Sequence, residues 1–67
     1  MYYRHYKGGI YEWLCEAKLE ADPTVTLVIY RSPEGMTWAR PREVFFEQVM
    51  HEGRWVDRFE RIDPPPK

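Results

Sequence analysis

The stretch TVTLVIYRSPEGMTWARP, from Thr24 to Pro41, decides the predicted fold because it contains two strand-like runs and the turn between them. Its first half is rich in β-branched residues, which favour strands, and it is apolar on both faces, which is typical of a central strand. The segment SPEG, residues 32–35, predicts a tight turn, since Pro33 presets the backbone φ angle. The stretch therefore predicts an antiparallel hairpin with MTWAR as its second arm.

Turn residues recur so often in the rest of the chain that short strands fit better than helices. Residues 47–62, EQVMHEGRWVDRFERI, predict a second hairpin that turns at Glu52-Gly53. The alternation in its second arm would place Trp55, Asp57, Phe59 and Arg61 on one face. Its other face would carry Val56, Arg58, Glu60 and Ile62.

One short helical turn is predicted between the two hairpins. Proline suits the first position of such a turn, so PREVFF, which starts at Pro41, favours a single turn between strands. We expect Val44 and Phe45 to fill one end of a small barrel.

The segment IYEWLCEAKLEA, residues 10–21, fits either a strand or a helix. As a strand it would turn an alternating row inward, made of Tyr11, Trp13, Cys15, Ala17 and Leu19. Its Glu, Leu, Ala and Lys content favours a helix instead. The turn residues on each side, Gly8-Gly9 and Asp22-Pro23, tip the balance towards a long strand. We interpret Cys15 as a buried, inert side chain.

Length and composition indicate a single small domain at residues 1–62, followed by a flexible proline-rich tail at residues 63–67. The net charge of −1 argues against non-specific binding of nucleic acid, which needs many cations. Cys15 is the only cysteine, so we expect a reducing compartment and no disulfide-linked partner. No signal peptide and no membrane-spanning run is recognisable, which predicts a cytoplasmic protein without a membrane partner.

The residue types that carry catalysis are present without the partners that they need. Ser32 is the only serine and lies in a predicted turn. His5 and His51 lack the ligand spacing of a metal site. The sequence therefore predicts no catalytic residue, no metal and no cofactor.

The segment YYRHYKGG, residues 2–9, interleaves aromatic rings with cationic side chains. Through His5, Tyr6 and Lys7 it could bind single-stranded nucleic acid, because bases stack on rings while cations neutralise the backbone. The same pattern is typical of a first strand whose rings pack in the core and whose charges face water. The residues alone favour the packing interpretation, because aromatic side chains more often serve packing in a chain this small.

Two arginines each close a predicted strand of the first hairpin. Arg31 lies beside the turn and Arg40 at the far end. A guanidinium group presents a planar fork of donors that suits a carboxylate or a phosphate. Trp38, two residues before Arg40, would share its face of the strand. The alternative is an internal ion pair with Glu43 or Glu47.

In their order along the chain, YRHYKGGIYEWL, LVIYR, TWARPREVFFEQV and DRFERI resemble a bacterial family of small proteins, the domain of unknown function 1653 family. The resemblance covers Tyr3 to Ile62 and implies a stand-alone, mainly β domain with a strand over residues 10–21. Val44-Phe45 stands where Met-Phe is usual in the family. The resemblance implies no activity, but it draws attention to motif residues that packing alone does not explain: His5, Lys7, Arg31, Trp38, Arg40 and Arg58.

We therefore expect a small, bent, antiparallel β-barrel, Src-homology-3-like, with one helical turn near Pro41. The expected function is a binding module for an anionic ligand such as a nucleotide or short RNA. Its predicted site residues are His5, Tyr6, Lys7, Arg31, Trp38, Arg40 and Arg58. The alternatives are a module that docks a peptide or larger protein partner and, less favoured, an enzyme with His5 as general base.

Overall fold

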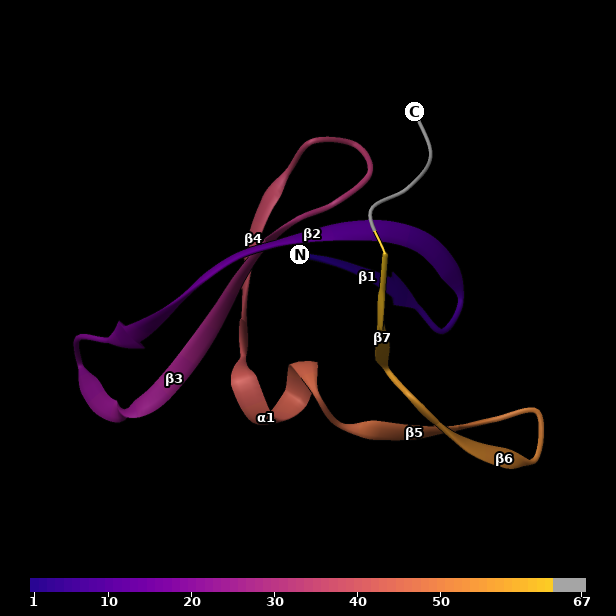
Figure 1. Ribbon diagram of the computed structural model, residues 1–67. Helices are drawn as coiled ribbons and strands as arrows, with labels where there is room; N and C mark the ends of the chain where they lie inside the picture. The colour runs from indigo at the N-terminus through magenta and orange to yellow at the C-terminus, as the bar shows by residue number, and fades with distance from the viewer. Residues whose placement is uncertain (64–67) are drawn as a thin grey trace.

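The computed structural model describes residues 1–63, which form seven strands and one short helix (Figure 1). The elements in chain order are β1 Tyr2–His5, β2 Gly8–Leu19, β3 Asp22–Arg31, β4 Thr37–Pro41, α1 Arg42–Phe45, β5 Gln48–His51, β6 Arg54–Asp57 and β7 Phe59–Ile62. The prediction of a mainly β fold with one helical turn after Pro41 is confirmed. The predicted proline-rich tail lies outside the described residues, apart from Asp63.

Five strands form one antiparallel sheet in the order β4-β3-β2-β1-β7, while β5 and β6 form a separate hairpin. As predicted, β3 is an interior strand of the sheet. The two edge strands, β4 and β7, do not pair with each other anywhere in residues 1–63. The sheet curls without closing (Figure 1), so the prediction of a closed barrel is wrong. The Src-homology-3 likeness stays a prediction.

Side chains, rather than backbone hydrogen bonds, fill the gap between the two edge strands. Pro41 at the end of β4 has no backbone N–H to donate to a neighbouring strand. The chain then leaves the sheet through α1, which places Phe45 inside the curl. The Phe45 ring stacks on Phe59 of β7, with centroids 4.2 Å apart and planes 4° from parallel. This stack provides packing across the open edge in place of a hydrogen-bonded ladder.

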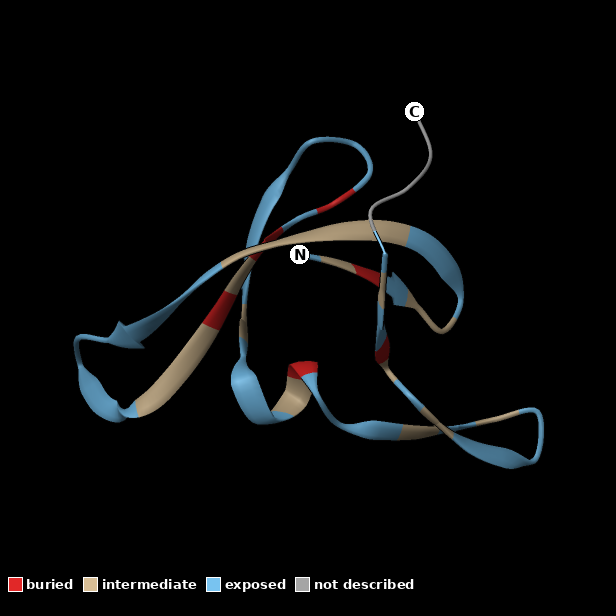
Figure 2. Ribbon diagram, viewed as in Figure 1, coloured by how far each residue is buried: buried red, intermediate tan, exposed pale blue. Residues whose placement is uncertain are grey.

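The buried core is aromatic and small. It consists of Tyr3, Val28, Tyr30, Phe45 and Phe59, with Tyr11 and Trp13 packed against it. Figure 2 shows these buried positions on β1, β3, α1 and β7 along the inside of the curl. Phe45 fills the end of the curl as predicted, while its neighbour Val44 is only partly buried.

The long strand β2 agrees with the predicted strand, but only its first half faces the core. The register with β3 shifts between Trp13 and Cys15. Strand β1 pairs with β2 only as far as Glu12, so the outer half of β2 has β3 beside it and no strand on its other side within the described residues. Cys15, Ala17 and Leu19 are exposed as a result. The prediction of a buried Cys15 is therefore wrong.

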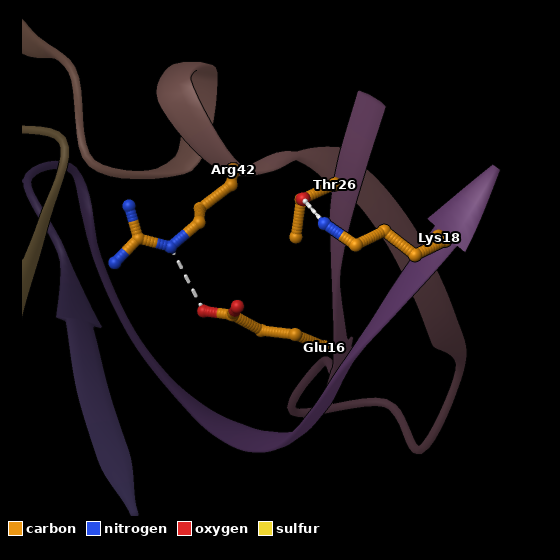
Figure 3. A network of polar contacts seen from close by, with 4 residues as sticks. All are labelled: Glu16, Lys18, Thr26 and Arg42. Atoms are coloured by element: carbon orange, nitrogen blue, oxygen red, sulfur yellow. Dashed lines mark hydrogen bonds and ion pairs between the residues drawn. The ribbon is translucent and has the colours of Figure 1, made fainter. Parts of the chain in front are cut away.

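The outer half of β2 still makes specific polar contacts, one of which joins it to the helical turn. The Arg42 Nε atom of α1 donates to Glu16 Oε2 of β2 at 2.9 Å, as Figure 3 shows. The Lys18 Nζ atom donates to Thr26 Oγ1 across the β2–β3 pair at 2.8 Å. The first contact ties α1 to the sheet near the point where Phe45 enters the core.

The second hairpin turns at Glu52-Gly53 as predicted, with positive φ angles of 51° and 79°. Two positive φ angles in a two-residue loop are the geometry that matches the twist of a hairpin. The predicted alternation fails beyond Asp57, because the chain bends at Arg58. The Arg58 N–H donates to the Glu47 carbonyl, and the Arg58 carbonyl accepts from the Tyr6 N–H. Phe59 is therefore buried in the sheet, while Trp55 is 64% exposed on the hairpin.

Candidate functional site

A pocket of about 280 Å³ lies inside the curl, where the edge strands approach each other. We call it the Arg40 pocket. It is lined by His5, Tyr11, Tyr30, Ser32, Glu34, Trp38, Arg40 and Phe59. These residues come from β1, β2, β3, β4 and β7 and from the turn after β3, so no short stretch of sequence contains the site.

Arg40 is held over two aromatic rings of the pocket. Its guanidinium carbon lies 5.9 Å from the Tyr30 ring centroid and 5.4 Å from that of Phe59. Cation–π contacts of this kind orient the flat group and leave its edge donors free. Trp38 lines the same pocket and is 50% exposed. Tyr30 belongs to β3, which pairs with β4, and Phe59 belongs to β7 at the opposite edge of the sheet.

The charge on Arg40 has no carboxylate partner among residues 1–63. Of the arginines in that range, the fold partly buries two, Arg40 and Arg58. Arg58 pairs with Glu47 at 3.2 Å, whereas no acidic group comes within ion-pair distance of Arg40. The internal pair of Arg40 with Glu43 or Glu47 is therefore not formed. The pocket contains a partly desolvated cation that is not neutralised.

His5 forms one wall of the pocket as a neutral ring. Burial, then the charges of Arg40, Arg58 and Lys7, lower the pKa of His5 below its usual value. Its Nδ1 atom accepts a hydrogen bond from the Lys7 backbone N–H at 3.2 Å. A neutral imidazole that accepts at Nδ1 carries its hydrogen on Nε2. His5 can thus donate from Nε2, and this tautomer does not favour a general base at that atom.

The turn after β3 contributes a hydroxyl group and a carboxylate to the pocket. The Gly35 N–H donates to the Ser32 carbonyl at 2.9 Å, and the Ser32 N–H donates to the Met36 carbonyl at 2.8 Å. Ser32 is only 7% exposed, and its Oγ atom has no hydrogen-bond partner of good geometry within the described chain. A buried hydroxyl without a partner is uncommon in folded proteins. The hydroxyl lies near the Glu34 carboxylate and lowers its pKa, so an incoming acceptor would compete with Glu34 for this donor.

The Arg40 pocket contains three of the seven predicted site residues, His5, Trp38 and Arg40. Arg31 pairs with Glu12 at 3.0 Å on the surface, and Arg58 pairs with Glu47. Neither arginine lines the Arg40 pocket.

Tyr6 and Lys7 lie in a neighbouring recess of about 480 Å³, which His5 also lines. The Tyr6 ring contacts His51 there, with centroids 5.2 Å apart. The Lys7 Nζ atom lies 5.7 Å from the Tyr6 centroid. Asp57 and Glu60 line the same recess, so it carries charges of both signs. The Arg40 pocket also carries both signs, through Arg40 and Glu34.

Sequence reasoning missed Ser32 and Glu34 as pocket residues. The SPEG turn was recognised, but only as a connection between strands. The signal that could have included it is its position directly after Tyr30, whose ring forms part of the pocket wall. A turn that follows a core-lining strand places its own side chains at the edge of that core.

Two kinds of feature are absent from the part of the chain that the structure describes. No three His, Cys, Asp or Glu side chains there are grouped so that they could hold a metal ion. The helix within residues 1–63, α1, lacks the length and apolar character needed to cross a membrane.

The residues that match a known protein family include the whole Arg40 pocket. The family described as "Protein of unknown function (DUF1653)" matches residues 1–61. The chain belongs to this family. The predicted membership of DUF1653 is therefore confirmed, and the match includes every residue that lines the Arg40 pocket. No curated protein and no solved structure shows a significant match. Since the DUF1653 description gives no activity, the function has to be argued from the pocket.

Proposed function

We propose that this protein is a small binding module whose Arg40 pocket holds the phosphate of a nucleotide or of the end of a short RNA. The observation that carries the proposal is the partly buried Arg40 guanidinium, oriented by Tyr30 and Phe59 and unpaired with any carboxylate of residues 1–63. Partial burial of an unpaired charge costs free energy. A bound anion would offset that cost.

Three donors are available to an anion in this pocket. They are the Arg40 fork, the Nε2–H of neutral His5 and the hydroxyl of Ser32. Hydrogen bonds from a guanidinium group to phosphate are short and charge-assisted, and the fork allows two of them at once. The mixture of one charged and two neutral donors suits a single phosphate.

Trp38 supports a nucleotide in particular. Its ring is half exposed beside Arg40, so one face is available to a flat base. Stacking of a base on an aromatic side chain contributes about 1–3 kcal/mol and tolerates different bases. Phosphate binding at Arg40 and base stacking on Trp38 would together use both the charge and the exposed ring.

The size of the pocket and the net charge of the protein favour a mononucleotide or the end of an RNA strand over a long stretch of RNA. A volume of about 280 Å³ lies just below the usual range for small-molecule sites, which is about 300–1,000 Å³. The net charge of −1 opposes contact with many phosphates. A mononucleotide or a strand terminus fits both observations.

A titration followed by amide chemical shifts tests the proposal. Adenosine 5′-monophosphate should shift the amides of the pocket residues, while adenosine and inorganic phosphate should each bind more weakly than the nucleotide. The Arg40→Gln variant should lose most of the binding. The matched control Arg54→Gln removes an exposed arginine on β6, outside the pocket, and should keep it. Shifts confined to other surfaces would contradict the proposal.

A second candidate function is the docking of a peptide or larger protein, and one observation favours it. Met50 and Trp55 lie opposite each other across the β5–β6 pair and are 55% and 64% exposed. Large exposed apolar side chains side by side are typical of interaction surfaces. Binding that depends on Trp55 and hardly responds to salt would support this function over the first.

A further inference from the structure

Two opposite charges line the Arg40 pocket without meeting. Glu34 and Arg40 both belong to its wall, yet they are too far apart to form an ion pair. A ligand that only supplied an anion would use Arg40 and leave Glu34 as a repulsive neighbour. A ligand that satisfies both groups must carry an anion together with hydrogen-bond donors.

The position of Glu34 is set by the backbone of its turn. Ser32 to Gly35 form a β-turn closed by the Gly35 N–H on the Ser32 carbonyl. Gly35 follows with a φ of 88°, a left-handed conformation that glycine adopts without strain. The second bond, from the Ser32 N–H to the Met36 carbonyl, completes a known hairpin connection, a type I turn followed by a bulge. Glu34 is thus presented at a defined point beside the pocket.

The Glu34 side chain is ionised at neutral pH. The Ser32 hydroxyl, and then the backbone N–H of Glu34 itself, lower the pKa of this carboxyl below its usual value. The hydroxyl lies near the carboxylate without meeting full hydrogen-bond geometry, so it does not use up the carboxylate oxygens. An ionised carboxylate only accepts hydrogen bonds.

We propose that Glu34 accepts hydrogen bonds from the sugar hydroxyls of the bound nucleotide, so that the pocket selects ribonucleotides over deoxyribonucleotides. This inference rests on the proposed function and names the class of nucleotide. The 2′-hydroxyl is the group by which a protein tells RNA from DNA at one site. A ribonucleotide combines the phosphate that Arg40 requires with the donors that Glu34 requires.

The test compares two nucleotides on one protein. Adenosine 5′-monophosphate should bind about tenfold more tightly than 2′-deoxyadenosine 5′-monophosphate, the scale of one hydrogen bond to a charged group that is open to water. The 2′-O-methyl derivative, which keeps the oxygen but has no hydrogen to donate, should bind as weakly as the deoxynucleotide. This comparison requires no variant and therefore does not depend on the folding of one.

Variants then assign the preference to Glu34. Glu34→Gln should lower the preference for the ribonucleotide from about tenfold to about twofold, because the amide oxygen accepts a hydrogen bond without the charge. Deoxynucleotide binding should be unchanged or slightly tighter, because a negative charge near the phosphate is gone. Glu43→Gln removes the same charge from an exposed position on α1, outside the pocket, and should keep the tenfold preference.

The outcomes separate this inference from the proposed function. Equal binding of the two nucleotides by the wild type, or a preference that stays near tenfold in Glu34→Gln, overturns the role of Glu34 while the nucleotide site stands. If neither nucleotide binds at millimolar concentration, the proposed function and this inference both fail. Free tryptophan could bind in place of the nucleotides, and Glu34→Gln could abolish that binding. This result would mean that the Glu34 carboxylate binds an ammonium group, and it would overturn the inference.

Discussion

At the scale of single residues, the distinction that matters is between Arg40 and Arg58. Both guanidinium groups are partly buried, but one faces aromatic rings and the other faces Glu47. The same side chain therefore has two different roles in this domain. Arg40 is available to a ligand, while Arg58 holds the bend between the β5–β6 hairpin and β7.

We predict that Arg40→Lys weakens nucleotide binding by about 1–3 kcal/mol, the scale of a charge-assisted hydrogen bond. Lysine keeps the charge but loses the fork and the flat stacking face. The free energy of unfolding should change by less than about 1 kcal/mol, since only cation–π contacts are lost. Isothermal titration calorimetry and urea denaturation on one variant measure both quantities. Arg58→Lys should show the opposite pattern, and a loss of stability without a loss of binding in Arg40→Lys would remove Arg40 from the site.

His5 should make folding depend on pH in a definite direction. Its pKa is lowered in the folded state, so the unfolded chain binds the proton more readily. The His5 contribution to stability is therefore fully present above the unfolded pKa of about 6.5 and is lost as the pH falls towards the folded value. Urea denaturation of the wild type and of His5→Asn between pH 7.5 and pH 5 measures it. If the two proteins lose stability in parallel, His5 is not the titrating group.

At the scale of elements, the four-residue helix α1 carries more of the packing than its length indicates. Phe45 is fully buried and stacks on Phe59, whereas the next residue, Phe46, is 38% exposed. One turn of helix thus directs one ring into the curl and leaves the other against the surface, where it contacts Arg42.

Phe45→Ala should unfold the domain, and Phe46→Ala should not. Removal of a buried aromatic ring costs about 3–5 kcal/mol, and small domains have a total stability of about 5 kcal/mol. Thermal unfolding followed by near-ultraviolet circular dichroism compares the adjacent variants directly. A folded Phe45→Ala variant with an unchanged melting temperature would mean that the open edge between β4 and β7 does not depend on this stack.

At the scale of the whole molecule, the charge distribution limits how a nucleic acid can bind. Three arginines are in ion pairs, Arg31 with Glu12, Arg42 with Glu16 and Arg58 with Glu47, so their charges are not free to follow a phosphate backbone. In the proposed site Arg40 is the arginine that would contact phosphate, while the exposed Arg4, Arg54 and Arg61 lie outside that pocket.

Short RNA should therefore bind with a shallow salt dependence. For single strands the slope of log K against log salt is about −0.7 for each phosphate neutralised, so one contact predicts a slope of about −0.7. Titrations of a short oligonucleotide between about 50 and 200 mM salt, the range in which the effect is strong, measure the slope. A slope steeper than about −3 would indicate that RNA is bound along an extended surface rather than by its end.

The sequence by itself determined the elements of this fold. Strand β3, the SPEG turn, the single helical turn after Pro41 and the turn at Glu52-Gly53 follow from residues within a few positions of each other. Their β-branched runs, prolines and glycines restrict the backbone locally, so no distant contact is needed to predict them. The resemblance to DUF1653 was equally readable, since its motifs lie in order along the chain.

Only the tertiary structure decided which side chains meet. The exposure of Cys15 depends on where β1 stops pairing with β2, and the open edge depends on β4 and β7 remaining unpaired. The Arg40 pocket joins Glu34 to His5 and Phe59, which lie far apart in the sequence. The sequence also left open which acidic residue pairs with which arginine, because the partners lie far apart in the chain. Contacts between distant residues follow from the order and curl of the strands, and the residues next to each side chain carry no information about that order.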